Sequence, residues 1–125
     1  MSDKTFRLDV VAPDAALYSG EATFVSAQTT VGQIGILANH EPMLGELAAG
    51  GAVVLTEASG ARKALAVQGG FLSVSATTVT VLAESAQFAG DIDVAAERAV
   101  LESAAEGSEE YLTAKSRVRA VEAVS

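Results

Sequence analysis

The sequence has no cysteine, no tryptophan, one histidine, two prolines and only six aromatic residues among its 125 positions. Without cysteine the chain can form no disulfide framework, thiolate nucleophile or thiolate metal site. A single histidine excludes a cluster of imidazole ligands. No apolar run approaches the roughly 18 residues that span a bilayer, and the first residues lack the basic-then-apolar pattern of a signal peptide. We expect a soluble intracellular protein with no cofactor, no metal and no segment inserted into the membrane.

Small apolar residues are abundant instead. Half of the chain is apolar, and 25 alanines and 15 valines make up most of that half. This apolar content excludes a disordered chain and is enough to bury a core. The net charge of −8 argues against binding nucleic acid through phosphate contacts.

Residues 1–88 have the pattern of short strands. Phe6, Leu8 and Val10 alternate with polar residues, which is the period of a half-buried strand. Further candidate strands follow at 22–29, 52–57, 62–68, 71–74 and 78–84. Strands of this length and spacing predict an antiparallel β-sandwich or barrel.

Glycines mark the connections between these strands. Ser59-Gly60 lies between two of the runs and is typical of a hairpin turn. Gly69-Gly70 lies between two others, where it indicates a bulge or close backbone packing.

From residue 89 onward the pattern becomes helical. Residues 94–106 contain no glycine, proline or aromatic residue, and Asp93 precedes them as an N-cap. Gly107 is suited to end this helix and Ser108 to cap the next. Apolar positions share one side of each helix: Ala96, Ala99 and Val100 in the first, and Tyr111, Ala114, Val118 and Val121 in the second. Two helices joined so closely must lie antiparallel, so we expect a C-terminal helical hairpin over residues 89–125.

Three of the eight basic residues, Lys115, Arg117 and Arg119, lie in the second helix toward the end of the chain. The helix dipole favours basic side chains near a C-terminus. A stable helix end and a contact with an acidic partner therefore both explain this cluster, and the sequence leaves the two open.

The sequence contains no recognisable catalytic motif. The glycine-rich residues 32–35 lack both the P-loop signature and the spacing of a dinucleotide fingerprint. No Gly-x-Ser-x-Gly elbow accompanies His40, and carboxylate pairs such as Glu41 and Glu46 arise by chance among 16 acidic residues. We expect no active site. In its loop before Pro42, His40 either holds the loop by hydrogen bonds to the backbone or contacts a partner.

Four segments resemble the ε subunit of bacterial F-type ATP synthases, in the right order and within the right total length. They are the opening residues 8–13 and 17–20, residues 32–42 (GQIGILANHEP), residues 67–74 (VQGGFLSV) and residues 79–86 (VTVLAESA). The resemblance covers the N-terminal 90 residues closely and the tail only in plan.

This resemblance implies the same β-sandwich with a helical hairpin, and it also implies a role. The protein would be a non-catalytic subunit of the central stalk that binds the γ subunit and rests on the ring of c subunits. It would turn with them and couple proton-driven rotation to the catalytic α and β subunits, while its tail could brake ATP hydrolysis. The implied location is peripheral, on the cytoplasmic face of the bacterial cell membrane.

The resemblance also implies site residues. The loop with the His-x-Pro motif faces the c ring in the family, which places Gln33 and His40 near the polar loops of the ring. The family has an acid where this chain has Gln33 and a proline where it has Ala38. The resemblance therefore does not carry over a charge contact from position 33, whereas a hydrogen bond from Gln33 stays open. Basic residues of the second helix meet an acidic segment of the β subunit when the hairpin extends, which makes candidates of Lys115, Arg117 and Arg119.

An ATP-binding motif of some ε subunits is degenerate in this chain. The motif reads Ile/Leu-Asp-x-x-Arg-Ala, and Ile92-Asp93 matches its first half, whereas Ala96 and Glu97 replace the Arg-Ala. Arg98 lies two positions late, about 200° around the helix. We predict weak or absent ATP binding.

A second hypothesis of another class stays open. The chain could be a free-standing β-sandwich adaptor whose helical tail binds some other partner. Co-purification with γ and the c ring would separate the two hypotheses.

Overall fold

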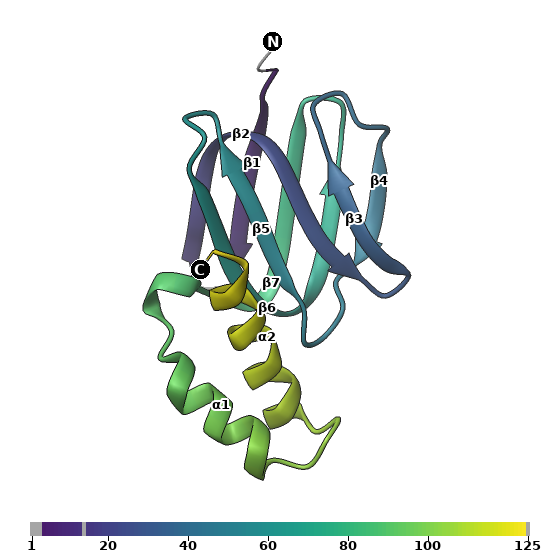
Figure 1. Ribbon diagram of the computed structural model, residues 1–125. Coiled ribbons are helices and arrows are strands. Elements are labelled where there is room, and N and C mark those ends of the chain that lie inside the picture. The colour runs from purple at the N-terminus through teal and green to yellow at the C-terminus, as the bar shows by residue number, and fades with distance from the viewer. Residues whose placement is uncertain (1–3, 14, 125) are drawn as a thin grey trace.

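The computed structural model describes residues 4–13 and 15–124, which form seven strands, a short 3-10 turn and two helices (Figure 1). The strands are β1 Phe6–Ala12, β2 Ala15–Thr29, β3 Gly32–Ile36, β4 Met43–Glu46, β5 Ala52–Glu57, β6 Arg62–Val74 and β7 Thr78–Phe88. The C-terminal part comprises η1 Ala89–Asp91, α1 Val94–Ser103 and α2 Glu109–Ala123. The expected β-sandwich with a helical tail is confirmed. Residues 1–3, on which the expected absence of a signal peptide partly rests, lie outside the described residues.

Five of the seven strands close into a ring, while β3 extends the sheet beside β2 and β4 extends it beside β6. They follow the order β1-β7-β6-β5-β2-β3, β4 pairs with β6, and β1 also pairs with β2. The long strands β2 and β6 join the two layers, since the first half of β2 pairs with β1 and its second half with β5 and β3. The pairings are antiparallel except that of β1 with β7, which is parallel and was not predicted.

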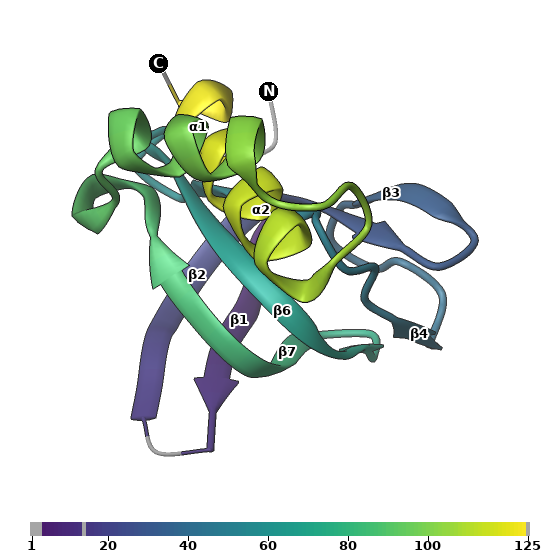
Figure 2. The ribbon, with the colours of Figure 1, turned by 90° about the horizontal axis from the view of Figure 1, so that it is seen from below.

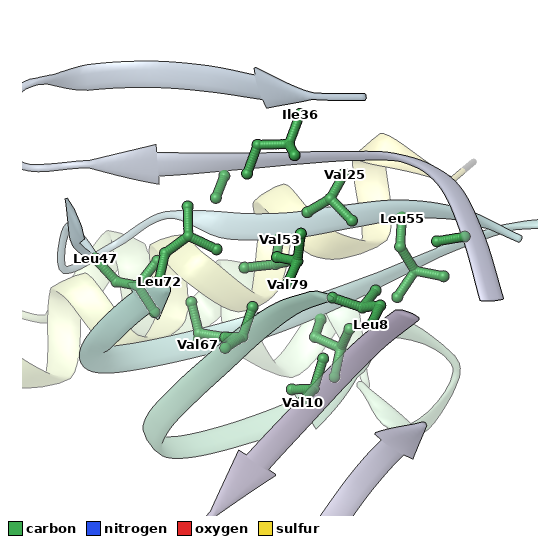
Figure 3. Close-up of a cluster of buried hydrophobic side chains, with 14 of the residues drawn as sticks. Leu8, Val10, Val25, Ile36, Leu47, Val53, Leu55, Val67, Leu72 and Val79 are labelled. Atoms are coloured by element: carbon green, nitrogen blue, oxygen red, sulfur yellow. The ribbon is translucent and has the colours of Figure 1, made fainter. Parts of the chain in front are cut away.

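The core lies between the layers and consists mainly of branched aliphatic side chains, together with Phe6 and three alanines (Figure 3). The predicted alternation in β1 is confirmed, because Phe6, Leu8 and Val10 are all buried. Val79 and Val81 of β7 are buried in the same way. Burial of such side chains contributes about 25 cal/mol per Å² of apolar area and holds the sandwich together.

A β-bulge at Gly69-Gly70 divides β6 into two parts. Gln68 pairs with Ser85 and Gly70 with Ala83, so Gly69 has no register partner in β7. Core-facing positions therefore change from odd to even numbers along the strand, from Val67 before the bulge to Leu72 after it. Gly70 has a φ of +114°, and a Cβ there would lie 1.9 Å from the carbonyl oxygen of Leu82. Both expectations for this glycine pair, a bulge and close backbone packing, are confirmed.

Both helix N-caps are found where the sequence placed them. The Asp93 carboxylate accepts a hydrogen bond from the Ala96 backbone N–H at 3.2 Å, and the Ser108 hydroxyl accepts one from that of Tyr111 at 3.2 Å. These bonds satisfy N–H groups that have no partner within the helix itself.

The first helix ends earlier than expected. α1 stops at Ser103, and Ala104 is extended with φ −79° and ψ 150°, so the predicted span 94–106 was too long. The Ser103 hydroxyl donates back to the carbonyl of Ala99 at 3.2 Å, a local bond of the kind that weakens a helix. Gly107, with φ +84°, belongs to the connecting turn.

The helix α2 lies between α1 and the sheet (Figure 2). Its predicted seam is present, with Ala114 and Val118 buried and Tyr111 and Val121 half-buried. The face predicted for α1 was wrong, because Ala96 and Ala99 are exposed. Its half-buried positions are Val94, Glu97, Val100 and Leu101, which follow one face at a spacing of three and four residues. Only Val100 of the predicted face belongs to this set.

A second buried face of α2 was not predicted. Ser116 and Ala120 are fully buried on the side of the sheet. Ala120 packs against Ala64 and Ala66 of β6 and against Ala89. Side chains this short allow the helix backbone to approach the sheet closely.

Candidate partner-binding surfaces

The turn between β2 and β3 presents an exposed apolar side chain beside Gln33. The Thr29 hydroxyl donates to the Gly32 carbonyl at 2.7 Å and accepts from the Val31 N–H at 3.3 Å, which holds the turn in shape. Val31 is 96% exposed at its tip. Gln33 is exposed and lies opposite Gln28 in the β2–β3 register. The turn is therefore held in shape and presents Val31 and Gln33 to solvent.

His40 occupies a different place from Gln33. Gln33 is the second residue of β3, whereas His40 lies in the loop beyond the far end of that strand, so the structure does not bring them together. The His40 ring nitrogen Nδ1 lies 2.8 Å from the carbonyl of Glu41, and its backbone N–H donates to that of Leu37 at 3.2 Å. These bonds fit the interpretation that His40 holds its own loop. A partner contact of His40 stays a prediction.

Arg117 faces the first helix. Its Nη1 lies 3.3 Å from Oε2 of Glu97, and the two side chains are 36% and 17% exposed. A second pair, Arg98 with Glu122 at 3.1 Å, also joins the helices but is exposed on both sides. Exposed ion pairs contribute little to stability, so the half-buried Arg117–Glu97 pair is the stronger electrostatic link between the helices.

Arg119 faces the sheet. Its Nη1 donates to Oε1 of Gln28 at 2.7 Å and to the carbonyl of Gly50 at 3.1 Å. Lys115 lies on the same edge of α2, with its hydrocarbon stem beside Gly50. Within the part of the chain that the structure describes, the Lys115 ammonium group makes neither a hydrogen bond nor an ion pair.

Ser116 anchors the helix between these contacts. Its hydroxyl lies 2.5 Å from the carbonyl of Gly51 and 3.2 Å from that of Val67. The β5–β6 ladder ends beside these carbonyls, since its last pair is Ala52 with Ala66. The hydroxyl thus satisfies backbone groups at the point where the two strands separate. The sequence carried one signal for this role, a serine inside a helix next to short side chains.

The residues of the degenerate ATP motif have structural roles. Asp93 caps α1, as described above, and Ile92 packs against the alanine cluster under α2. Arg98 points to Glu122 at the end of α2. These contacts occupy the side chains without a nucleotide.

A cavity of about 580 Å³ lies between the start of α2 and the bulge of β6. It is lined by Ala49, Gln68, Gly69, Glu84, Ser85, Glu109, Leu112 and Thr113. Its charged lining residues are the acids Glu84 and Glu109, which repel a polyanion such as ATP. The described residues contain no group of three or more His, Asp or Glu side chains arranged to hold a metal ion.

Apolar side chains form a strip on the outer face of the sandwich, beyond the bulge. Phe71 of β6 is opposite Leu82 of β7, and Leu82 is the register partner of Val11 in β1. Leu44 of β4 is the diagonal neighbour of Phe71, a distance that large side chains bridge. Phe71 and Leu82 are 49% and 48% exposed. We name these four residues the outer strip. Grouped exposed apolar side chains make this strip a candidate interaction surface, which the sequence alone did not predict.

Two shifted pKa values belong to clusters that join neighbouring strands. Burial, reinforced by a hydrogen bond to Glu57 at 3.0 Å, raises the pKa of Tyr18 to about 12. Hydrogen bonds from Ser19 and Arg7 lower the pKa of Asp9 below its usual value. Both clusters tie strands together on the surface of the sandwich.

None of the helices among the described residues is long and apolar enough to cross a bilayer.

Comparisons with known proteins agree on one family. The family model described as ATP synthase, Delta/Epsilon chain, beta-sandwich domain matches residues 5–89. The ATP synthase epsilon chain of Nocardia farcinica is 54% identical over 124 residues, which cover 99% of this chain and 95% of that one. The epsilon chain of Rhodococcus opacus is 56% identical over 115 residues, covering 92% and 94%.

Solved structures show the same fold at low sequence identity. A chain of the Euglena gracilis mitochondrial ATP synthase, in a structure of OSCP, F1 and c-ring, has a TM-score of 0.72 at 20% identity. That match covers 97% of this chain and 82% of the other. A chain of the Tetrahymena thermophila mitochondrial ATP synthase central stalk and c-ring has a TM-score of 0.61 at 18% identity, with both chains fully covered.

Proposed function

The chain belongs to the family of ATP synthase epsilon chains, and from this premise we propose that it is a non-catalytic rotor subunit of the central stalk. One observation carries the proposal: the similarity to bacterial epsilon chains runs through both the sandwich and the helical tail. Such a subunit couples rotation of the c ring to ATP synthesis through the γ subunit. Its place is peripheral, on the cytoplasmic face of the cell membrane.

We propose that the chain consists of two parts with different functions, which meet between residues 88 and 89. The sandwich, residues 1–88, attaches the protein to the rotor. The helical tail, residues 89–125, regulates. The last strand ends at Phe88 and the tail contacts the sandwich through α2 and η1, which supports this division.

We assign separate surfaces of the sandwich to the two rotor partners. The outer strip places the exposed side chains of Leu44, Phe71 and Leu82 on neighbouring strands, and we propose that the γ subunit covers it. Polar loops of the c ring offer hydrogen-bonding groups, and the held β2–β3 turn with exposed Gln33 suits them. His40, beyond the other end of β3, is the second candidate for the ring.

We propose that the tail brakes ATP hydrolysis when it leaves the sandwich and meets the catalytic α and β subunits. Its docking surface is made mainly of alanines, which bury little area each. Helices of 10 and 15 residues are marginal on their own. A contact of this strength suits a switch, because small free-energy changes alter its population. Lys115, Arg117 and Arg119 are the candidates for contact with an acidic segment of the β subunit.

Affinity purification from cells tests attachment to the rotor. The tagged full-length chain should recover γ and the c ring in stoichiometric amounts. Recovery of a different partner without γ would favour a β-sandwich adaptor instead.

Steady-state hydrolysis by the assembled enzyme tests the brake. Deleting residues 90–125 should raise the hydrolysis rate while γ is still recovered. An unchanged rate would remove the brake from the proposal and leave the rotor role standing.

A further inference from the structure

Two of the three cations that we assign to an acidic partner are already bound inside the folded chain. Glu97 on α1 holds Arg117, and Gln28 on β2 together with the Gly50 carbonyl holds Arg119. Both holding side chains lie outside α2. In the docked tail, α1 therefore binds Arg117 and the sandwich binds Arg119. These are the same two side chains that we propose to contact the β subunit.

The chemistry of these contacts resembles that of the expected partner. A guanidinium bound by carboxylate and carbonyl oxygens forms charge-assisted hydrogen bonds, and an acidic peptide segment offers the same oxygens. Each contact is half-buried, so it is screened less by solvent than an exposed pair. Arg117 and Arg119 must leave these oxygens before they can contact those of another chain.

We propose that Glu97 and Gln28 are masking residues, which compete with an acidic protein segment for Arg117 and Arg119. The inference rests on the proposed function, because it adds a regulatory contact to the tail. Docking of the hairpin and binding to the partner exclude each other through the same two side chains. The equilibrium between them is set by residues that never touch the partner.

This mechanism predicts opposite effects for the two sides of each contact. Removing a masking residue leaves the cations intact and frees them, so affinity for an acidic segment rises. Removing the cations frees the tail but abolishes the binding. Gln28→Glu gives Arg119 a carboxylate of nearly the same shape, so it should tighten the mask and lower the affinity.

Titration of the isolated full-length chain with a fluorescent peptide of alternating aspartate and glutamate measures this ranking. Hydrogen bonds to charged groups correspond to roughly tenfold changes in an equilibrium constant, and exposure reduces this here. We expect Gln28→Ala and Glu97→Gln to bind the peptide about threefold to tenfold more tightly than wild type. The Gln28→Glu variant should bind about threefold more weakly, and the double variant Arg117→Gln, Arg119→Gln should lose most of its affinity.

Matched controls separate masking from net charge and misfolding. Glu102→Gln makes the same charge change on an exposed position of α1 and should leave the affinity within about twofold of wild type. Hydrogen exchange of the α2 amides should be faster in Gln28→Ala and slower in Gln28→Glu, with the sandwich amides unchanged. Equal affinities of wild type, Gln28→Ala and Gln28→Glu would overturn the proposal, as would equal gains from Glu97→Gln and Glu102→Gln.

The assembled enzyme gives a second readout. Gln28→Ala should lower hydrolysis about twofold, whereas Arg119→Gln should raise it, although both weaken docking. A change in the same direction would overturn masking. If tail deletion showed that no brake exists, the order of peptide affinities measured on the isolated variants would still test whether Glu97 and Gln28 mask the two arginines.

Discussion

At the scale of single residues, Gly70 allows the β-bulge that determines which side chains of β6 face the core. Because Gly69 is bulged out of the register, the positions of β6 that face outward change from even to odd numbers at the bulge. Before the bulge, Ala64 and Ala66 contact α2, and after it Phe71 belongs to the outer strip. The bulge needs a residue without a Cβ, since the backbone of β7 lies directly against Gly70.

Replacing this glycine tests that requirement. Gly70→Ala should destabilise the protein by about 2 to 4 kcal/mol, because the methyl group meets the Leu82 carbonyl and φ is positive. The control is Gly60→Ala, whose φ of +94° is also positive but whose Cβ has nothing within 4 Å. It should cost about 1 kcal/mol. Urea unfolding measures both, and equal losses would show that the close contact is unimportant.

Tyr18 should make stability fall at alkaline pH. Its pKa in the folded chain is about 12, against 10.0 for a free side chain, so the neutral form is favoured by folding. The folded protein keeps this proton when the unfolded chain has lost it. The stabilisation is therefore complete below about pH 10 and is lost as pH rises toward about 12.

The Tyr18→Phe variant removes this titration. Between those pH values the unfolding free energy of wild type should decline with a slope that one group limits to about 1.4 kcal/mol per pH unit. The variant should show a flatter decline over this range. Parallel curves for wild type and Tyr18→Phe would contradict the assignment.

At the scale of elements, the tail is held by α2. α2 has a buried face toward the sheet and another toward α1, whereas α1, all of whose residues are described, has no buried residue. The sheet-side face combines short side chains with the Ser116 anchor. Docking of the whole hairpin therefore depends on how closely α2 approaches β5 and β6.

Enlarging a side chain on that face should undock the hairpin. Ala120→Leu overpacks a fully buried site and should weaken docking by about 1 to 3 kcal/mol. Ala95→Leu adds the same atoms to an exposed position of α1 and should have little effect. Hydrogen exchange should accelerate over 109–123 in the first variant, while the core strands keep their protection. Uniform acceleration throughout the chain would indicate that tail and sandwich unfold as one unit.

At the scale of the whole molecule, the two proposed activities occupy different surfaces. The outer strip lies beyond the bulge of β6, while the tail docks on the stretch before it. Attachment to the rotor and release of the tail can therefore be altered separately.

Polar substitutions in the outer strip should break attachment only. The double variant Phe71→Ser, Leu82→Ser should reduce recovery of γ about tenfold or more, because it removes a large aromatic side chain and its apolar neighbour from the centre of the proposed interface. Both side chains are half-exposed in the isolated chain, so its stability should fall by only about 1 kcal/mol. Val124→Ser, at an exposed apolar position of the tail, is the control. Full recovery of γ by the double variant would place its contact elsewhere.

Local signals in the sequence determined much of this protein. The alternation around Leu8, the caps Asp93 and Ser108, and the glycine pair at the bulge all depend on neighbours along the chain, and each was read correctly. The family resemblance rested on such segments as well.

The tertiary structure determined the contacts between segments that are distant in the sequence. Only the closed fold pairs β1 with β7 in parallel, buries Ser116, and places Glu97 and Gln28 against the two arginines. It also separates Gln33 from His40 by the length of β3, although they are close in sequence. No local pattern encodes these contacts, because they follow from how closely α2 approaches the sheet and from the register of strands far apart in the chain.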